Sequence, residues 1–380
     1  MLKILSFILF FSPITVFSAP LSQNDISILL PLPKSQSEEL PFSPSTLGKF
    51  GELLPKSVYS KMPPLDFENP EETYRKLRVV AIRIDSCFPL SPPLVGCQSQ
   101  IRFVWQPVAG AADGKVYAND SAVHTFYDLT ESEFLGVISQ LEKLKDSVGP
   151  SSSNDILTVN PLLKKQGILS VYAKELFSII LTQVGSSRLR QATFMQLSGA
   201  GNVWVFGGFL ISGGVVTELP IPRISGFTQT FFNNPMPFSP TYFSNGAISP
   251  APTGKDTFNL LVRNSRDITK ADEPEVIEGT MAAIRIENPQ RHNVHTMDCV
   301  SCHTAQVARI WATRQYPWLA LEPRGQQFKF QSKFNLINNS PNQDNTTTVR
   351  AFGYKGLDPA ISQRTINETA AVLEKLYSEP

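Results

Sequence analysis

Residues 299–303, Cys-Val-Ser-Cys-His, place two thiols three positions apart and an imidazole directly after the second. Such a pentapeptide can attach a haem, contribute to a zinc site or carry out thiol redox chemistry. A structural zinc needs four ligands, and the other cysteine pair, Cys87 and Cys97, has the wrong spacing for a second zinc-binding pair. A thioredoxin-like pair would open a helix in a βαβ unit, and the surrounding sequence predicts no such unit. The pattern therefore favours haem over zinc or thiol redox chemistry.

The spacing of the motif meets the needs of covalent haem attachment. Two thioether bonds to one porphyrin need thiols about one helical turn apart, and the next residue then points an imidazole at the iron. At this motif and its flanks, though not over the whole chain, the sequence resembles the c-type cytochromes. The resemblance implies one covalently bound haem c, with thioether bonds from Cys299 and Cys302 and His303 as proximal ligand of the iron. It also implies attachment outside the cytoplasm.

A second axial ligand, if it is His or Met, has to come from before the motif. Residues 304–380 contain neither type, whereas small cytochromes of this kind carry a methionine downstream. We prefer His292 or His295, because a turn at Asn288-Pro289 could bring either around the haem edge; a surface-loop position is the alternative for both. The remaining candidates are His124, Met62, Met195, Met236, Met281 and Met297. Two axial ligands favour outer-sphere electron transfer, whereas an open position would admit peroxide or a gas.

The first 18 residues, MLKILSFILFFSPITVFS, carry one early lysine and then an almost continuous apolar run. This pattern predicts a secretory signal peptide cleaved before Ala19, since the run is short for a membrane span. A retained N-terminal anchor is the alternative. We expect a periplasmic or secreted protein with no membrane span after cleavage.

The expected export also bears on Cys87 and Cys97. Neither has a histidine beside it, and in an oxidising compartment two such cysteines form a disulfide by default. The loop of about ten residues that they would close is rich in proline. Two free thiols or a metal pair are the alternatives.

Net charge gives no indication of a nucleic-acid partner. The chain has 34 Lys and Arg against 33 Asp and Glu, and removal of residues 1–18 takes away one lysine, which leaves a neutral protein. A redox partner protein would therefore have to recognise a local patch rather than bulk charge. With 42% hydrophobic residues, the chain can bury a large core.

Composition and periodicity divide the chain into four predicted parts. These are a signal peptide at 1–18, an extended Pro/Ser-rich segment at 19–75, an α+β domain of unknown role at 76–222 and a haem-binding domain at 223–380. The expected fold class is α+β: an antiparallel sheet with packed helices in the first domain, followed by a mixed cytochrome c-like haem module.

The first domain contains the clearest local signals. Thr130 and Glu133 form a capping-box pattern ahead of apolar residues at helical spacing, which predicts a helix as far as Val148. A second helix is predicted at 169–184, before Gly185. Apolar alternation and Gly-rich turns predict strands near 80–84, 101–105, 192–197, 202–211 and 215–221.

The second domain is less regular. We expect a loop over 220–256, a helix from the motif to Pro317 and a final helix after Asp358-Pro359. On the helix after the motif, Arg309 and Arg314 could pair with the haem carboxylates, and solvated helix charges are the alternative. Apolar patterns predict strands at 258–262, 282–286 and 328–336. The tetrapeptide Ala-Ile-Arg-Ile occurs at 81–84 and again at 283–286, but the flanks do not match, so no repeat is inferred.

These features predict an exported monohaem c-type cytochrome that transfers single electrons to or from a protein partner. Most of the chain precedes the motif, far more than is needed to enclose one porphyrin. A haem enzyme, such as a peroxidase or a small-molecule oxidase, and a haem-containing sensor or binding protein are therefore the alternatives. The sequence indicates no acid/base pair near the haem, so we assign no catalytic residue and favour a carrier over an enzyme.

Overall fold

The computed structural model describes residues 20–35, 38, 40–63, 69–90, 96–149, 155–197, 203–233, 243–263 and 265–378. Its helices are α1 Gln23–Ile26, α2 Lys56–Tyr59, α3 Pro70–Lys76, α4 Glu131–Val148, α5 Pro161–Gln166, α6 Val171–Leu181, α7 Asn259–Arg263, α8 Glu273–Glu287, α9 Cys299–Gln315, α10 Leu321–Gly325 and α11 Gln363–Ser378. Its strands are β1 Ser27–Leu29, β2 Leu47–Gly48, β3 Gly51–Glu52, β4 Leu77–Pro89, β5 Cys97–Gly110, β6 Val116–Ala118, β7 Ala122–Leu129, β8 Leu189–Leu197, β9 Val203–Ser212, β10 Val215–Glu218, β11 Thr228–Asn233, β12 Phe243–Ser249, β13 Phe352–Lys355 and β14 Asp358–Ile361.

One large sheet organises the molecule. Within the described ranges it has ten strands in the order β1-β4-β5-β7-β8-β9-β11-β12, with β6 beside β5 and β10 beside β9. All of these neighbours are antiparallel. The predicted α+β class and antiparallel sheet are confirmed. Because β11 and β12 come after residue 222, the sheet continues across the predicted domain boundary.

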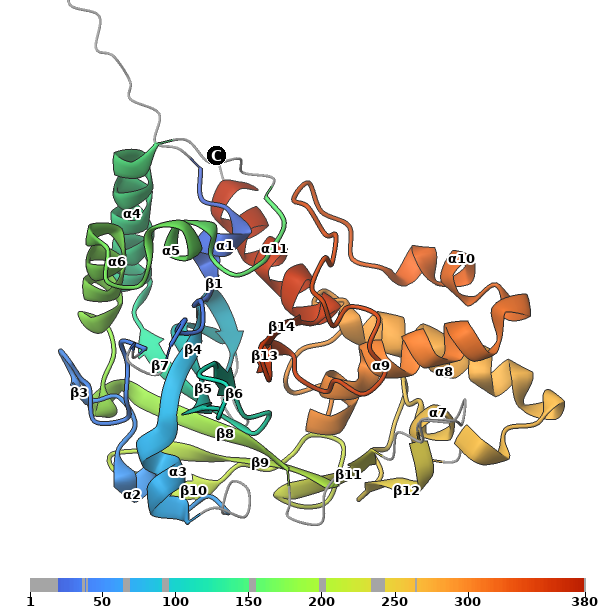
Figure 1. Cartoon of the computed structure of the whole chain (residues 1–380). Helices are drawn as coiled ribbons and strands as arrows, with labels where there is room; N and C mark the ends of the chain where they lie inside the picture. Colours follow the sequence, from blue (N-terminus) through green and yellow to red (C-terminus); the bar gives the residue numbers. More distant parts are fainter. Residues whose placement is uncertain are drawn as a thin grey trace, which may run out of the picture.

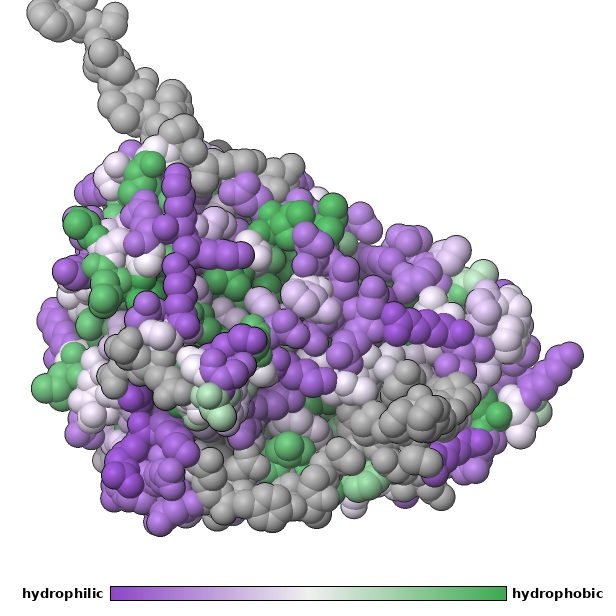
Figure 2. Space-filling model, in the orientation of Figure 1, coloured by the Kyte–Doolittle hydropathy of each residue, from purple (hydrophilic) through white to green (hydrophobic). Residues whose placement is uncertain are grey.

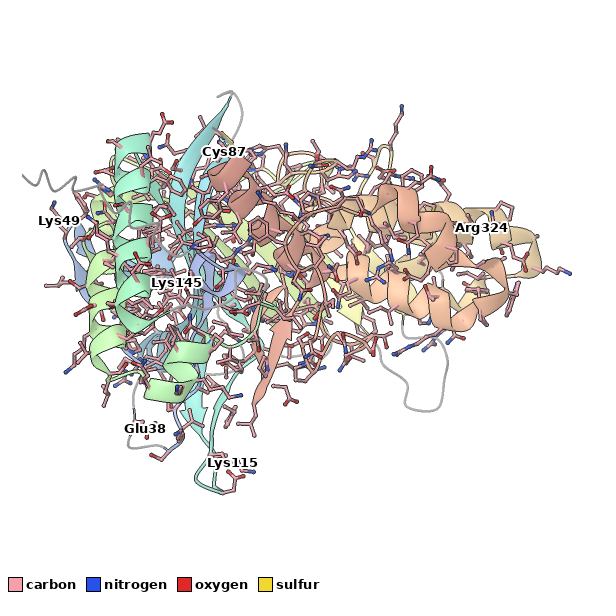
Figure 3. The ribbon with its side chains drawn as sticks, turned by 90° about the horizontal axis from the view of Figure 1, so that it is seen from above. Glu38, Lys49, Cys87, Lys115, Lys145 and Arg324 are labelled. Atoms are coloured by element: carbon pink, nitrogen blue, oxygen red, sulfur yellow. A yellow bond between two sulfur atoms is a disulfide. The ribbon has the colours of Figure 1, made fainter. Side chains whose placement is uncertain are left out.

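Helices cover both faces of this sheet (Figure 1). On one face, α4 contacts α6 and also β5 and β7. On the other, α9 contacts β9 and β11, and α11 contacts β4. Seen from above, the two groups of helices stand on opposite sides of the strands (Figure 3). Cys87 near the end of β4 and Lys115 in the turn between β5 and β6 lie at opposite edges of this view (Figure 3).

The two helices predicted for the first domain are confirmed as α4 and α6. At the start of α4, Thr130 Oγ1 accepts from the Glu133 N–H at 3.3 Å, and Glu133 Oε2 accepts from the Thr130 N–H at 2.9 Å. The residues of α4 at helical spacing, among them Phe134 and Val137, are buried. Local capping and core burial agree here, which is why the sequence was sufficient.

Two strands predicted in the C-terminal part are wrong, because residues 259–263 form α7 and residues 282–286 belong to α8. Residues 281–284 of α8 are all buried, since α7, α9, α10 and α11 surround that helix. A helix enclosed by other helices has a nearly continuous apolar sequence. Periodicity does not distinguish such a run from a buried strand.

Other expectations also need correction. Residues 220–256 are not only loop, because β11 pairs with β9 and β12 pairs with β11. Residues 328–336 form no strand, and Leu336 O accepts from Gln363 Nε2 at 2.9 Å instead of joining a ladder. Long-range pairing decides both cases, and it leaves no local signature.

The N-terminal segment differs as well. An extended segment was predicted for 19–75, but residues 23–26 form α1, residues 21–30 are buried and β1 pairs with β4. The final helix begins at Gln363, later than expected, because residues 358–361 form β14 against β13. The predicted signal peptide at 1–18 lies outside the described residues.

The surface seen in Figure 2 is mainly hydrophilic, with hydrophobic residues in scattered groups. Scattered apolar side chains of this kind are ordinary on a protein surface. Among the helices of the described ranges, none has both the length and the apolar character needed to cross a bilayer.

Candidate functional site

The cysteine motif occupies the first turn of α9, and buried polar groups fix this turn. Asp298 is the N-cap: its Oδ1 accepts from the Ser301 N–H at 2.9 Å and its Oδ2 from the Ser301 hydroxyl at 2.6 Å. Gln229 of β11 holds the turn from the sheet, since its Nε2 donates to Asp298 Oδ1 at 2.7 Å and its Oε1 accepts from the Val300 N–H at 2.9 Å. The motif is therefore attached to a rigid element.

The two thiols and the imidazole of the motif face one cavity. Cys299, Cys302 and His303 lie deep in the molecule, yet each is only half-buried because it lines this cavity. His303 Nδ1 is 2.8 Å from the carbonyl oxygen of Val349. A carbonyl only accepts, so Nδ1 carries the proton and the lone pair is on Nε2. The ring centroid of Phe206 lies 5.0 Å from that of His303.

The sheet forms the opposite wall of the cavity. Residues paired across neighbouring strands project to the same face. One row across β4, β5, β7 and β8 consists of Arg83, Arg102, Phe126 and Gln191, and all four line the cavity. The next row brings Val104, His124 and Thr193 to the same wall.

His124 is therefore a second imidazole in the cavity. Its Nδ1 lies 3.2 Å from Thr193 Oγ1 on the neighbouring strand. Burial, followed by the positive charges of Arg350 and of His303, holds the pKa of His124 well below its usual range. Burial also lowers the pKa of His303, to about 4, against a smaller opposing effect of its bond to Val349. Both rings are neutral at neutral pH.

A group of charged side chains forms one end of the cavity. Glu368 of α11 lies at its centre, 2.8 Å from Arg83 and 2.7 Å from Arg364, and Arg102 pairs with Asp85. Burial alone would raise the pKa of Glu368, but the neighbouring guanidinium groups lower it far below its usual range. Three guanidinium groups thus face two carboxylates, and Arg83, Arg102, Arg364 and Glu368 line the cavity.

Arg350 is a further buried cation, and its charge acts on both His124 and His303. Its side chain is fully buried, and its nearest carboxylate is Asp120, 3.4 Å from Nε. Its three side-chain nitrogens have no hydrogen-bond partner within the described ranges. Burial lowers the pKa of Arg350 and raises that of Asp120, so neither charge is well compensated.

The two cysteine pairs are in different states. The predicted disulfide between Cys87 and Cys97 is confirmed, with a Cα–Cα distance of 4.9 Å. Cys299 and Cys302 are free thiols. Burial raises the pKa of Cys302 to about 11 and raises that of Cys299 still further, so both thiols are protonated at neutral pH.

The preferred candidates for the second axial ligand lie outside the cavity wall. His292 Nε2 is 2.8 Å from Asp256 Oδ2, and its Nδ1 is 3.1 Å from Thr296 Oγ1. His295 Nε2 is 3.2 Å from the carbonyl oxygen of Pro89. Iron binding by His292 or His295 stays a prediction. The positions of the two side chains outside the cavity do not support it.

The two arginines considered for the haem carboxylates also lie away from the cavity. Arg309 pairs with Glu287 at 3.0 Å and with Glu322 at 2.8 Å, and Arg314 is 3.9 Å from Asp344. Sequence reasoning did not single out Gln229 or Arg350, and it gave His124 only as one of several candidates. The alternation of residues in β7 could have placed His124 on the other face of the strand from Val123 and Tyr127. It could not have placed His124 across the cavity from the motif.

A haem c fits the groups that face this cavity. Two neutral thiols, an imidazole with a free lone pair and aromatic side chains line it. At one end, Arg83, Arg102 and Arg364 exceed their two carboxylate partners by one positive charge, which could pair with a haem carboxylate. Within the described ranges, no three His, Cys, Asp or Glu side chains converge as ligands of a bare metal ion.

Comparisons with known proteins give no relative. No family model, no curated protein and no solved structure matches this chain.

Proposed function

We propose that this protein is an exported monohaem c-type cytochrome that carries single electrons through a covalently attached haem. One observation carries the proposal: Cys299, Cys302 and His303 face the same cavity, and the His303 Nδ1–H donates to the Val349 carbonyl. This bond leaves Nε2 as the metal-binding nitrogen, in the arrangement common among metal-ligating histidines.

The protein groups have distinct roles in this proposal. Cys299 and Cys302 form the two thioether bonds, and His303 Nε2 binds the iron from the side of α9. Gln229 and Asp298 hold the first turn of α9, which keeps the three groups in place. When bound, the haem supplies a one-electron couple whose potential depends on its axial ligands, burial and hydrogen bonds. Arg83, Arg102 and Arg364 at the charged end of the cavity provide cations for the haem carboxylates.

The disulfide supports the exported location, because such bonds persist in oxidising compartments. The composition of residues 1–18 supports it independently. Covalent haem attachment in the c-type cytochromes takes place in the same kind of compartment, so the three arguments agree.

A haem enzyme is the second candidate. It is favoured by the polar side chains of Arg102, Gln191 and Thr193 on the sheet wall of the cavity, where a small substrate could bind beside the iron. An enzyme would show a five-coordinate iron and turn over peroxide, whereas a carrier would be low-spin and inert to peroxide.

The mass of the intact, mature protein tests the proposal. The expected result is the polypeptide plus one haem, in a form that survives denaturation and acid–acetone extraction. The control is the same protein produced without the haem-attachment machinery, which should show the polypeptide mass alone. A mature protein that carries no tetrapyrrole would remove the basis of the proposal.

A further inference from the structure

We propose that His124 of β7 is the second axial ligand of the haem iron, opposite His303. This inference rests on the proposed function. It assigns an iron ligand to the N-terminal part of the chain, about 180 residues before the cysteine motif. It also gives the sheet a direct role in the redox centre.

The position of His124 follows from strand register. His124 pairs with Val104 on one side and with Thr193 on the other, and all three side chains line the cavity. His303 enters the same cavity from α9, which lies on this face of the sheet. A planar group held between the sheet and the start of α9 would therefore have one imidazole on each side.

Both imidazole rings have a hydrogen-bond partner at Nδ1. His303 Nδ1 is tied to a carbonyl oxygen at 2.8 Å, and His124 Nδ1 lies 3.2 Å from the Thr193 hydroxyl. No hydrogen bond in the described part of the chain involves Nε2 of either ring. The Val349 carbonyl can only accept, so it fixes the tautomer of His303. The Thr193 hydroxyl can donate or accept; in the tautomer in which His124 Nδ1 donates to it, Nε2 presents the lone pair that an axial ligand requires.

The competing histidines are committed elsewhere. Both ring nitrogens of His292 lie within hydrogen-bonding distance of Asp256 and Thr296, and His295 contacts Pro89. Neither side chain lines the cavity.

Among the methionines, Met297 does line the cavity, but it directly precedes the N-cap of α9 and so belongs to the same wall as His303. Met62, Met195 and Met281 are buried and do not line it. Met236 lies outside the described residues.

Ligation by His124 has a functional consequence for the proposed carrier. Two imidazoles lower the reduction potential relative to a His/Met pair, and they fill both axial positions. Small ligands could then bind only when His124 has left the iron. Their apparent affinity is therefore reduced in proportion to the fraction of protein in which His124 is dissociated.

The test compares spin states and ligand binding in purified holoproteins. Wild-type protein should be low-spin in both oxidation states by absorption and electron paramagnetic resonance. His124→Ala should be high-spin in the ferric state, return to low-spin on addition of imidazole, and bind carbon monoxide in the ferrous state about tenfold more tightly or better. His124→Gln, which keeps a polar side chain of similar size, should behave in the same way if alanine prevents folding.

Three matched variants serve as controls. His292→Ala, His295→Ala and Met297→Leu should keep the wild-type spectra. A low-spin His124→Ala protein, or a change to high spin in any control, would overturn the assignment of His124. Each variant is first checked by mass for covalent haem. A wild type without haem contradicts the proposed function itself, whereas a haem-loaded variant with unchanged spectra contradicts only this inference.

Discussion

The two cysteine pairs of this molecule have the same side-chain chemistry but opposite structural settings. Cys87 and Cys97 lie on the neighbouring antiparallel strands β4 and β5, where Pro89 is the register partner of Cys97, and they are bonded to each other. Cys299 and Cys302 lie in one turn of α9, and both face the cavity as free thiols. Two neighbouring strands bring their sulfur atoms within bonding distance of each other. Two cysteines in one helical turn instead point the same way, so both can react with a single ligand.

This contrast separates a structural pair from a chemical pair. The disulfide closes the outer end of the β4–β5 pair and adds stability without entering the cavity. The motif thiols are not bonded to each other, and they lie on the wall that the cofactor would touch. Substitution of the Cys299/Cys302 pair should therefore affect haem attachment, and substitution of the Cys87/Cys97 pair should affect stability.

The largest expected effect is on cofactor attachment. Cys299→Ser/Cys302→Ser should contain no covalent haem, because both sulfur atoms that form the thioethers are absent. Haem staining of a denaturing gel and the intact mass measure this. The matched control, Cys87→Ser/Cys97→Ser, should keep its haem. Equal loss of haem from both double variants would mean that the two pairs do not differ in role.

The next effect concerns thiol reactivity in protein produced without haem attachment. Burial raises the pKa of Cys302 from 9.0 to about 11, so at pH 8 its thiolate fraction is about a hundredfold below that of an unperturbed thiol. Since only the thiolate reacts, alkylation by iodoacetamide should be slow and should rise with pH up to about pH 11. Peptide mass mapping gives the rate at each cysteine. Rapid labelling of Cys302 in the folded protein at pH 8 would contradict the raised pKa of this thiol and the burial that causes it.

A smaller effect is expected on stability. Loss of the Cys87–Cys97 bond should lower the free energy of unfolding by about 2–3 kcal/mol, because a loop of this size is no longer closed in the unfolded chain. Chemical denaturation of wild type and of Cys87→Ser/Cys97→Ser measures the difference, with haem content held equal. An unchanged midpoint, with an unchanged denaturant slope, would show that the disulfide has no stabilising role.

The tetrapeptide Ala-Ile-Arg-Ile shows where sequence reasoning reached its limit. At 81–84 it lies in β4, and at 283–286 it lies in α8. In β4, Arg83 faces the cavity while Ile82 and Ile84 fill the opposite side. In α8, Ile284 and Ile286 are buried among helices, and Arg285 reaches Asp256 and Glu278. Identical residues thus satisfy either structure, and tertiary contacts decide between them.

Local signals predicted the features of the molecule that are local. The motif, the helix that follows it, the capping box at Thr130 and the disulfide each depend on neighbouring residues, and the structure has that helix, cap and disulfide. The sheet wall depends on which strands are neighbours. The sequence therefore gave His124 only as one candidate among eight and did not single out Gln229 or Arg350.

The burial of residues 21–30 has a consequence for the order of folding. The Leu21 N–H donates to the Tyr377 hydroxyl at 2.7 Å, and the Ser27 and Thr369 hydroxyls are 2.7 Å apart. α11 can therefore pack against β1 only after α11 has been synthesised. The same helix brings Glu368 to the cavity. A chain emerging from a ribosome or a translocon cannot complete this arrangement from its beginning. Until α11 has been made, residues 21–30 lack part of their cover, and the cavity beside the motif lacks the wall to which Arg364 and Glu368 belong.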